Sequence, residues 1–454
     1  MVSCKIIHRL IFFISFFYYS SIANCKLEFN DSLLINIINK SINYLHVTQI
    51  KDNNQPNTFV GEWPSYIYNC ANIPFLGKKG KSAYDSNVFN TLFIHNAMAE
   101  LYLTFNKNSQ ILELLSLAQK NFKYFKNESS FNFWPELLRP SHLKCKHKNC
   151  KQRRPVNFNY HYGFINNYAN IYDDADDTSA GYLAYYLSNK VKDSSGTNQL
   201  DYFNTDSYFK NFVLYRDTGI RKTNWYNKKN GFKYRTGAFF TWFGPDRKPS
   251  HFFTWFFPYH HKQNILYGRN EVDCVVNANI LKTLYTLGDT TISGVKESKE
   301  FLRKVIAKNK CQTCGVYYPT EFSFHYALAK AISAGLTGFN DLKEVLISEI
   351  LKQKNQQGFW ESQIEGNDVQ CTLYALNAIM MLSSDKKILN EIEPGINFLL
   401  EKRINDQTLT HWNGGVFFSG GSAIRYEHVW ISDAYTTCLA IETLTNYLNF
   451  KKQL

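Results

Sequence analysis

The stretch Asp173-Asp174-Ala175-Asp176-Asp177-Thr178 places four carboxylates within five residues, just before the apolar run Gly181-Tyr182-Leu183-Ala184-Tyr185-Tyr186-Leu187. The pattern predicts the first turn of a helix, where aspartates three or four residues apart crowd one end. One interpretation is an exposed acidic helix start, because Asp and Thr are common capping residues. Aromatic and small residues flank the cluster, however, which favours burial. Neighbouring buried carboxylates repel each other, so at least one should stay protonated at neutral pH, as a general acid requires.

Similar segments recur along the chain, and each begins with an acidic residue. The heads are Asp85, Asp176, Asp273, Glu321, Asp368 and Asp433, each before a run of small and apolar residues. They stand at intervals of about fifty residues or about twice that, as in helical repeats. Between them, the periodicity predicts charged, amphipathic helices at 298–308, 342–354 and 389–403. Small buried helices therefore alternate with polar outer ones.

This alternation predicts an all-α fold. Six inner and up to six outer helices suit a closed ring, an (α/α)6 toroid with a single barrel, because no helical hairpin can bury its apolar face alone. A closed ring would set Asp176 across a central cavity from Asp273, Asp368 and Asp433. An open solenoid is the alternative, and it would spread these heads along a ridge.

Aromatic residues follow glycine in the predicted turns, at Gly61-Glu62-Trp63, Gly315-Val316-Tyr317 and Gly358-Phe359-Trp360. The stretch 350–360, which ends in the last of these turns, resembles a degenerate QW repeat of squalene-hopene cyclases and related terpenoid cyclases. The stretch Asp174-Ala175-Asp176-Asp177-Thr178 matches the DxDD(T) motif of the same enzymes. The resemblance covers the repeats from about residue 57 to residue 449.

The resemblance implies that Asp174, Asp176 and Asp177 are catalytic. Asp176 would donate a proton to an isoprenoid alkene, and Asp174 and Asp177 would maintain its protonation and orientation. Three features depart from the family. Lys354 stands where the QW repeat has glutamine. The chain has room for one toroid where these cyclases usually carry two, and an exported member would be unusual.

The composition excludes two broad classes of protein. Of 454 residues, 44% are apolar and 16% are aromatic, which is incompatible with a disordered chain. The net charge of +13 comes largely from scattered lysines, and no basic stripe accompanies a nucleic-acid-binding motif. We therefore expect no nucleic-acid partner.

The N-terminal residues have the pattern of a secretory signal peptide. Lys5 and Arg9 precede the apolar run 10–17, and small residues follow, with cleavage expected after Ala23. The apolar run is short for a membrane span, and no later run reaches 18 apolar residues. We expect a mature chain without a transmembrane segment, secreted or periplasmic.

We divide the chain into a signal peptide, 1–24, and an α/α toroid domain, 25–454. An aromatic-rich insertion at 198–267, which holds Trp242 and Trp255, interrupts the repeat. It is either an outer helix with embellishments that pack on the ring, or a flap that lines the cavity. In a flap, aromatic faces can stabilise a carbocation or stack on sugars. The glycine-rich stretch 411–421 predicts a turn before the last inner helix.

Of ten cysteines, Cys4 leaves with the signal peptide and nine remain. An exported protein forms disulfides by default, and the odd number leaves at least one thiol free. Cys311 and Cys314 form a C-x-x-C pair, while Cys145 and Cys150 share a basic loop. A zinc site built from these residues and His147 is chemically possible. The compartment favours disulfides, so we assign no metal ligand and no cofactor.

The candidate substrate-binding residues are three of the acidic heads and four tryptophans. They are Asp273, Asp368, Asp433, Trp242, Trp255, Trp360 and Trp412.

Three functions fit the pattern. The first is a terpenoid-cyclase-like enzyme, an isomerase that protonates an isoprenoid alkene or a related apolar substrate. The second is a secreted glycoside hydrolase or lyase that acts on a glycan through paired carboxylates, one on each side of the cavity. The third is a non-catalytic toroid that binds a protein or lipid partner. A closed apolar cavity would favour the first, and an open groove lined with tryptophan would favour the second.

Overall fold

The computed structural model describes residues 30–53, 57–70, 79–138, 151–159, 171–206, 208–218, 227–228, 230–232, 235–244, 270–420 and 428–453. The chain divides into two units, residues 1–37 and 38–454. The first unit, described from residue 30, holds the first turns of helix α2 (Asp31–Thr48). Everything below concerns the second unit.

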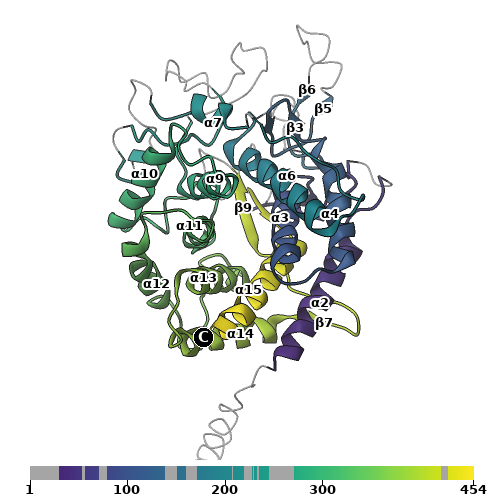
Figure 1. The fold of residues 1–454 in the computed structure, drawn as a ribbon, viewed down its shortest axis with the longest axis vertical. Coiled ribbons are helices and arrows are strands. Elements are labelled where there is room, and N and C mark those ends of the chain that lie inside the picture. The colour runs from purple at the N-terminus through teal and green to yellow at the C-terminus, as the bar shows by residue number, and fades with distance from the viewer. Residues whose placement is uncertain are drawn as a thin grey trace, which may run out of the picture. The chain divides into compact units, whose positions relative to one another are not determined.

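Helices that follow the acidic heads form an inner ring. They are α3 (Val88–Thr104), α6 (Ala175–Ser195), α9 (Cys274–Leu287), α11 (Ser323–Ser333), α13 (Asp368–Leu382) and α15 (Asp433–Gln453). Each packs on the next in this order, and α15 packs on α3, so the ring closes (Figure 1). The predicted all-α toroid is therefore confirmed, and the open solenoid is excluded.

A second set of helices lies outside this ring. Its members are α4 (Ser109–Phe122), α10 (Val295–Ala307), α12 (Lys343–Leu351), which follows the short helix η2 (Asn340–Leu342), and α14 (Ile388–Lys402). Helix α4 packs on α3, α10 on α9, and α12 and α14 on α13. Most residues of the inner helix α3 are buried, whereas α10 buries one face and exposes charged residues on the other. This difference matches the predicted alternation of buried and polar helices.

The predicted insertion at 198–267 interrupts the alternation between α6 and α9. Among the described residues of this insertion, Lys210–Leu214 form helix α7, and most of the others lie in loops and turns. Phe239 packs against Phe212 of α7 at 6.0 Å between ring centroids. These described aromatic residues are buried. Both interpretations of the insertion stay predictions, because residues 245–269 lie outside the described part of the chain.

Three buried tryptophans tie the loops of the repeat to outer helices. The indole nitrogen of Trp63 donates to the carbonyl of Leu45 at 2.7 Å. Trp360 donates in the same way to Ile350 of α12, and Trp412 to Leu399 of α14. Each hydrogen bond satisfies a buried indole N–H and a helix carbonyl at once. The aromatic-after-glycine pattern at Trp63 and Trp360 therefore marks a structural joint of the repeat.

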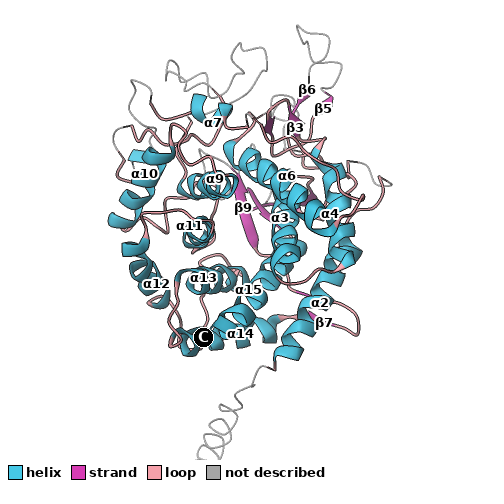
Figure 2. Cartoon of the chain, viewed as in Figure 1, coloured by secondary structure: helices cyan, strands magenta, loops and turns pink. Residues whose placement is uncertain are grey.

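A small antiparallel sheet joins segments from the two ends of the unit. Its strands are β1 (Tyr66–Asn69), β2 (Ser82–Tyr84), β9 (Val416–Gly420) and β10 (His428–Ile431), in the order β2-β1-β10-β9. Figure 2 labels β9 of this sheet, in magenta among the cyan helices. Tyr66 pairs with Ile431 in this sheet. The turn predicted at 411–421 is wrong in part, because β9 occupies residues 416–420 of that stretch. The apolar run Val416-Phe417-Phe418 suits a strand whose partner lies beside it.

Three two-stranded sheets and one disulfide complete the described fold. The sheets pair β3 (Lys126–Asn127) with β4 (Ser130–Phe131), β5 (Leu137–Leu138) with β6 (Lys151–Gln152), and β7 (Ile404–Asn405) with β8 (Thr410–His411). The disulfide joins Cys274, at the start of α9, to Cys314 after α10. Cys145 and Cys150 lie outside the described residues, as does the predicted signal peptide. None of the helices in the described part of the chain is both long and apolar enough to cross a membrane.

Candidate active site

The aspartate cluster occupies the first turn of α6. Asp174 is the N-cap residue, and its Oδ1 accepts a hydrogen bond from the backbone N–H of Asp177 at 2.7 Å. The hydroxyl oxygen of Thr178 accepts from the backbone N–H of Phe131 in β4 at 2.9 Å. On the other flank, the N–H of Ala175 donates to the carbonyl of Thr241 at 2.8 Å. The start of α6 is therefore held from two sides.

Asp176 is the member of the cluster that faces the centre of the ring. Its residue surface is 6% exposed, and its carboxylate lines a cavity enclosed by the inner helices. Oδ1 accepts a hydrogen bond from the side-chain amide of Asn279 in α9 at 2.9 Å, and Oδ2 accepts from the hydroxyl of Tyr318. Both donors come from side chains of other segments, so they set the orientation of the carboxyl group.

The pKa of Asp176 is raised to about 6. Burial is the main cause, because the charged form loses its hydration, and the hydrogen bonds from Tyr318 and Asn279 partly offset it. Repulsion from the nearby Asp273 adds a smaller increase. The group is thus protonated in an acidic medium, and its conjugate base has two donors ready to stabilise it.

Asp174 and Asp177 form a buried pair behind Asp176. Burial raises the pKa of both, and for Asp177 the charge of Asp174 raises it further. Oδ1 of Asp177 has no hydrogen-bond partner among the described residues. Such a pair keeps at least one proton at neutral pH, as the sequence pattern predicts.

Asp173 plays a different part. Its carboxylate accepts hydrogen bonds from the side chains of Asn127, Ser130 and Asn132. These residues lie in or beside the β3–β4 hairpin, and Asp173 does not line the cavity. It therefore anchors the hairpin to the head of α6.

The cavity beneath Asp176 has a volume of about 80 Å³ and is lined by residues from all the inner helices named above. Its aromatic residues are Phe89, Phe93, Tyr318, Tyr326, Tyr374 and Tyr435. Stacked pairs fix several of these rings, with Phe93 and Tyr435 at 4.1 Å between centroids. The hydroxyls of Tyr374 and Tyr435 lie 3.0 Å apart and share a hydrogen bond. We call this cavity the chamber. Among the described residues, the carboxyl group in its wall is that of Asp176.

Sequence reasoning did not single out these aromatic residues. A usable signal exists, because several stand within two turns of an acidic head. Phe89 and Phe93 follow Asp85, and Tyr374 follows Asp368. Side chains that stand about one to two turns along an inner helix from its acidic head reach the chamber.

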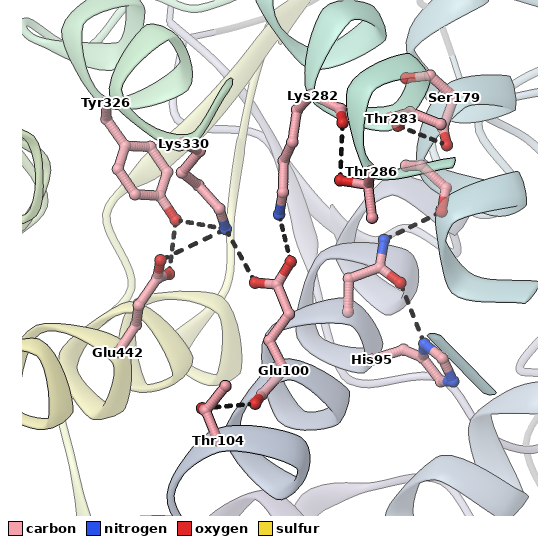
Figure 3. Close-up of polar contacts among 12 residues, drawn as sticks. His95, Glu100, Thr104, Ser179, Lys282, Thr283, Thr286, Tyr326, Lys330 and Glu442 are labelled. Atoms are coloured by element: carbon pink, nitrogen blue, oxygen red, sulfur yellow. Dashed lines mark hydrogen bonds and ion pairs between the residues drawn. The ribbon is translucent and has the colours of Figure 1, made fainter. Parts of the chain in front are cut away.

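An ion-pair layer closes the far side of the chamber, formed by Glu100, Lys282, Lys330 and Glu442 (Figure 3). Lys282 Nζ lies 2.6 Å from Glu100 Oε1, and Lys330 Nζ lies 3.4 Å from Glu442 Oε1. The hydroxyl of Tyr326 donates to Glu442 at 2.6 Å and accepts from Lys330 at 3.1 Å. Two ammonium groups face two carboxylates, so the layer carries no net charge.

The two lysines of the layer respond differently to their surroundings. Burial lowers the pKa of Lys282. Burial acts in the same direction on Lys330, but the charges of Glu442 and Glu100 outweigh it and raise the pKa of this residue. Both lysines also line a second cavity of about 470 Å³, so the layer separates two compartments of the ring.

The predicted acidic heads Asp273, Asp368 and Asp433 do not line the chamber. The carboxylate of Asp273 accepts four backbone N–H groups, from Val275, Val276, Val316 and Tyr317. Asp368 accepts from the N–H of Ser362 at 2.8 Å, and Asp433 from the N–H of Gly414 at 2.6 Å. Asp273 caps α9 in this way, whereas Asp368 and Asp433 hold loop backbone near the starts of α13 and α15.

The predicted tryptophans also lie outside the chamber lining. Trp360 and Trp412 are the fully buried joints described above. The indole of Trp242 donates to Glu271 at 3.1 Å and to the hydroxyl of Tyr317 at 2.8 Å. Trp255 lies outside the described residues. Among the residues that the structure describes, the aromatic members of the chamber lining are therefore phenylalanines and tyrosines.

The fold is shared with solved structures at low sequence identity. The type II terpene cyclase MstE from Scytonema, in complex with geranylgeranyl dihydroxybenzoate, superposes with a TM-score of 0.52 at 13% identity, covering 92% of this chain and 99% of that one. Its complex with merosterolic acid A gives 0.51 at 13% identity, over 92% and 98% of the two chains. A protein from Actinoplanes gives 0.51 at 10% identity, over 92% and 100%. No protein-family model and no curated protein sequence matches the chain.

These comparisons show a terpenoid-cyclase-like α/α toroid fold. The chain covers nearly the whole length of MstE, so a single toroid of this size is not a departure from that fold.

Proposed function

We propose that this chain, with its terpenoid-cyclase-like toroid, is a cyclase that protonates an isoprenoid alkene through Asp176. The observation that carries the proposal is the position of Asp176. It is the carboxyl group that lines a buried aromatic chamber, and its hydrogen-bond donors are side chains. This position supports acid catalysis by Asp176, because a general acid must face the reacting atom.

The reaction begins with transfer of the Asp176 proton to one carbon of an alkene. The other alkene carbon becomes a carbocation, and Asp176 becomes a carboxylate that Tyr318 and Asn279 stabilise. A second alkene of the same molecule attacks the cation, which closes a ring and moves the charge. Loss of a proton from a carbon of the final cation ends the sequence. One proton enters and one leaves, so the product is an isomer of the substrate.

The chamber suits this chemistry in two further ways. The faces of Phe89 and Tyr318 are electron-rich surfaces near Asp176, and such faces attract a developing cation. The ammonium groups of Lys282 and Lys330 would repel a cation, but they lie at the opposite side and are paired with glutamates. We infer that positive charge develops at the Asp176 end of the chamber.

A glycan-cleaving function has less support. Glycoside hydrolysis generally needs a second carboxylate across the scissile bond. The other heads considered for this role bind backbone or neighbouring loops, including Glu321, which accepts from Ser362 and Gln363. Within the described residues, Asp176 is the carboxylate that lines the chamber.

We also propose that the protein is exported. The pattern of residues 1–24 supports this, and the disulfide between Cys274 and Cys314 fits an oxidising compartment. N-terminal sequencing of the protein recovered from its native compartment tests it. A mature chain that begins near Asn24 is expected, and an intact Met1 would contradict the proposal.

The function is tested with purified protein and a series of linear prenyl substrates. Geranylgeranyl dihydroxybenzoate, the substrate bound to MstE, is a reasonable first probe, followed by shorter and unsubstituted prenyl compounds. We expect a product of unchanged mass and altered retention. The Asp176→Asn variant should bind the substrate without converting it, and Asp433→Asn, a change at an exposed carboxylate outside the chamber, should convert it normally. Undiminished conversion by Asp176→Asn would remove Asp176 from the mechanism.

A further inference from the structure

A second cluster of reactive side chains lies away from the chamber. It comprises Cys311 in the turn after α10, His325 in α11 and Glu349 in α12. One thiol sulfur, one ring nitrogen and one carboxylate oxygen all lie within 4.8 Å of one another. His325 is fully buried, Cys311 is buried, and Glu349 is partly exposed. None of the three lines the chamber, so the proposed cyclisation does not use them.

The imidazole of His325 has one ring nitrogen without a polar partner. Nδ1 makes no hydrogen bond among the described residues, whereas Nε2 lies 3.4 Å from Oε2 of Glu349, within ion-pair distance. Aromatic rings of Phe322 and Phe324 flank the imidazole at 5.5 and 6.1 Å between centroids. A buried, unsatisfied imidazole is costly for a fold unless a further group binds it.

The side-chain types of the cluster indicate that this further group is a divalent cation. A divalent cation would stabilise both the thiolate and the carboxylate, and the imidazole can bind it in its neutral form. Two negative ligands and one neutral ligand balance a charge of +2.

The C-x-x-C turn explains why a thiol is available here. Cys314 is bonded to Cys274, which leaves Cys311 free beside His325. Gln312 of the same turn accepts from the N–H of Phe322 at 3.5 Å, next to the start of α11. The turn therefore presents the Cys311 sulfur to α11 and α12 together.

We propose that Cys311, His325 and Glu349 bind a zinc ion that joins the turn after α10, the inner helix α11 and the outer helix α12. Sulfur, nitrogen and oxygen ligands together favour zinc over magnesium or calcium, which take oxygen ligands. Ligand atoms around a tetrahedral zinc stand about 3.3–3.7 Å apart. The His325–Glu349 separation of 3.4 Å already meets this requirement. The partly exposed side of Glu349 leaves room for a water as fourth ligand.

Metal content and cobalt spectroscopy test the site independently of any enzymatic activity. The full chain is purified without chelator and its zinc is measured by mass spectrometry. It is then stripped with a chelator and titrated with Co²⁺, whose bond to a thiolate gives a charge-transfer absorption band. We expect about one metal ion per chain and a cobalt band in the wild-type protein.

Two variants and one control locate the ligands. Cys311→Ser should abolish the thiolate band, and Glu349→Gln should weaken metal binding at least about tenfold while keeping the band. Glu349 is partly exposed, so its variant folds even where a change at His325 does not. Cys371→Ser is the matched control, because Cys371 is also a buried free thiol near carboxylates. It should keep both the metal and the band.

Three results would overturn the proposal. The first is a wild-type chain that neither carries zinc nor gives the cobalt band. The second is a Cys311→Ser variant that binds zinc as tightly as the wild type, which would place the metal elsewhere, for example at Cys145 and Cys150. The third is equal loss of metal in Cys311→Ser and Cys371→Ser.

Discussion

Asp176 and Asp273 begin neighbouring inner helices, and both are buried carboxylates, yet their partners differ completely. Asp273 accepts four backbone N–H groups and is fully buried. Asp176 accepts hydrogen bonds from one side-chain amide and one side-chain hydroxyl, and it lines the aromatic chamber. A carboxylate whose oxygens are occupied by backbone holds the fold together. One whose oxygens are shared with side chains and a cavity is available for chemistry.

The largest expected effect is on the Asp176 side of this contrast. Asp176→Asn keeps the size and hydrogen-bond capacity of the side chain but removes the acid. We expect kcat to fall by about 10²–10⁴-fold with little change in substrate affinity, because a general acid contributes about that much to a rate. Single-turnover kinetics with the active prenyl substrate provide the measurement. A change in KM alone would show that Asp176 only positions the substrate.

The other side of the contrast is tested by Asp273→Ala. This variant loses an N-cap and leaves the N–H groups of Val316 and Tyr317 without their acceptor. We expect a loss of about 3 kcal/mol in the free energy of unfolding, from the cap and the unsatisfied donors together. Urea denaturation measures it. Asp433→Ala, which removes the acceptor of the Gly414 N–H at an exposed position, should cost about 1 kcal/mol or less.

Folded Asp273→Ala protein should still turn over substrate at a rate near that of the wild type. A variant as stable as wild type but inactive would reverse the roles that we give to the two aspartates.

Tyr318→Phe sharpens the contrast by removing one side-chain donor from Asp176. The acid form of Asp176 is the active one, so activity should fall as the pH rises through its pKa of about 6. The Tyr318 hydroxyl lowers that pKa, so its removal should shift the fall to higher pH. We also expect about a tenfold lower maximal rate, since one donor to the carboxylate product is lost. A pH–rate profile provides the measurement.

Tyr374→Phe is the control for this experiment. Its hydroxyl also faces the chamber region but pairs with Gln370 and Tyr435, not with Asp176. An equal pH shift in both variants would contradict the assignment of Tyr318.

The smallest effect concerns the buried pair behind Asp176. The pKa of Asp177 is raised in the folded chain, mainly by burial, so the folded state keeps a proton that the unfolded state releases above about pH 4. Stability from this group is therefore present at low pH and is lost as the pH rises towards the folded pKa. Asn cannot ionise, so Asp177→Asn should be more stable than wild type at pH 8 by about 1 kcal/mol. Thermal unfolding at pH 5 and pH 8 measures it, and parallel curves would refute it.

The toroid was predictable because its signal is local and repeated. Each head, from Asp85 to Asp433, precedes a run of small residues, and amphipathic helices separate the runs. The number of repeats suits a closed ring of helices, and the packing of α15 on α3 confirms that the ring closes. The pairing of β1 with β10 was not predictable, because more than 350 residues separate Tyr66 from Ile431 and no local pattern links them.

The site was predictable only in part. The acidic cluster marks Asp176 because charge is concentrated there beyond the needs of capping. Its donors Asn279 and Tyr318 come from other segments, and only the ring geometry brings them to it. The ion-pair layer likewise combines residues of four helices, and it depends on their relative depth, which spacing along the sequence does not reveal. Trp360 and Trp412 were noticed by pattern, but the pattern could not distinguish a structural joint from a binding surface.

The most direct test of the central claim follows the proton itself. The purified enzyme converts its prenyl substrate in D₂O, and the product is analysed by mass spectrometry and NMR. Protonation by Asp176 predicts one non-exchangeable deuterium, at the alkene carbon that accepts the proton, and no labelled product from Asp176→Asn. A cyclised product without deuterium, or labelled product from Asp176→Asn at the wild-type rate, would contradict the account.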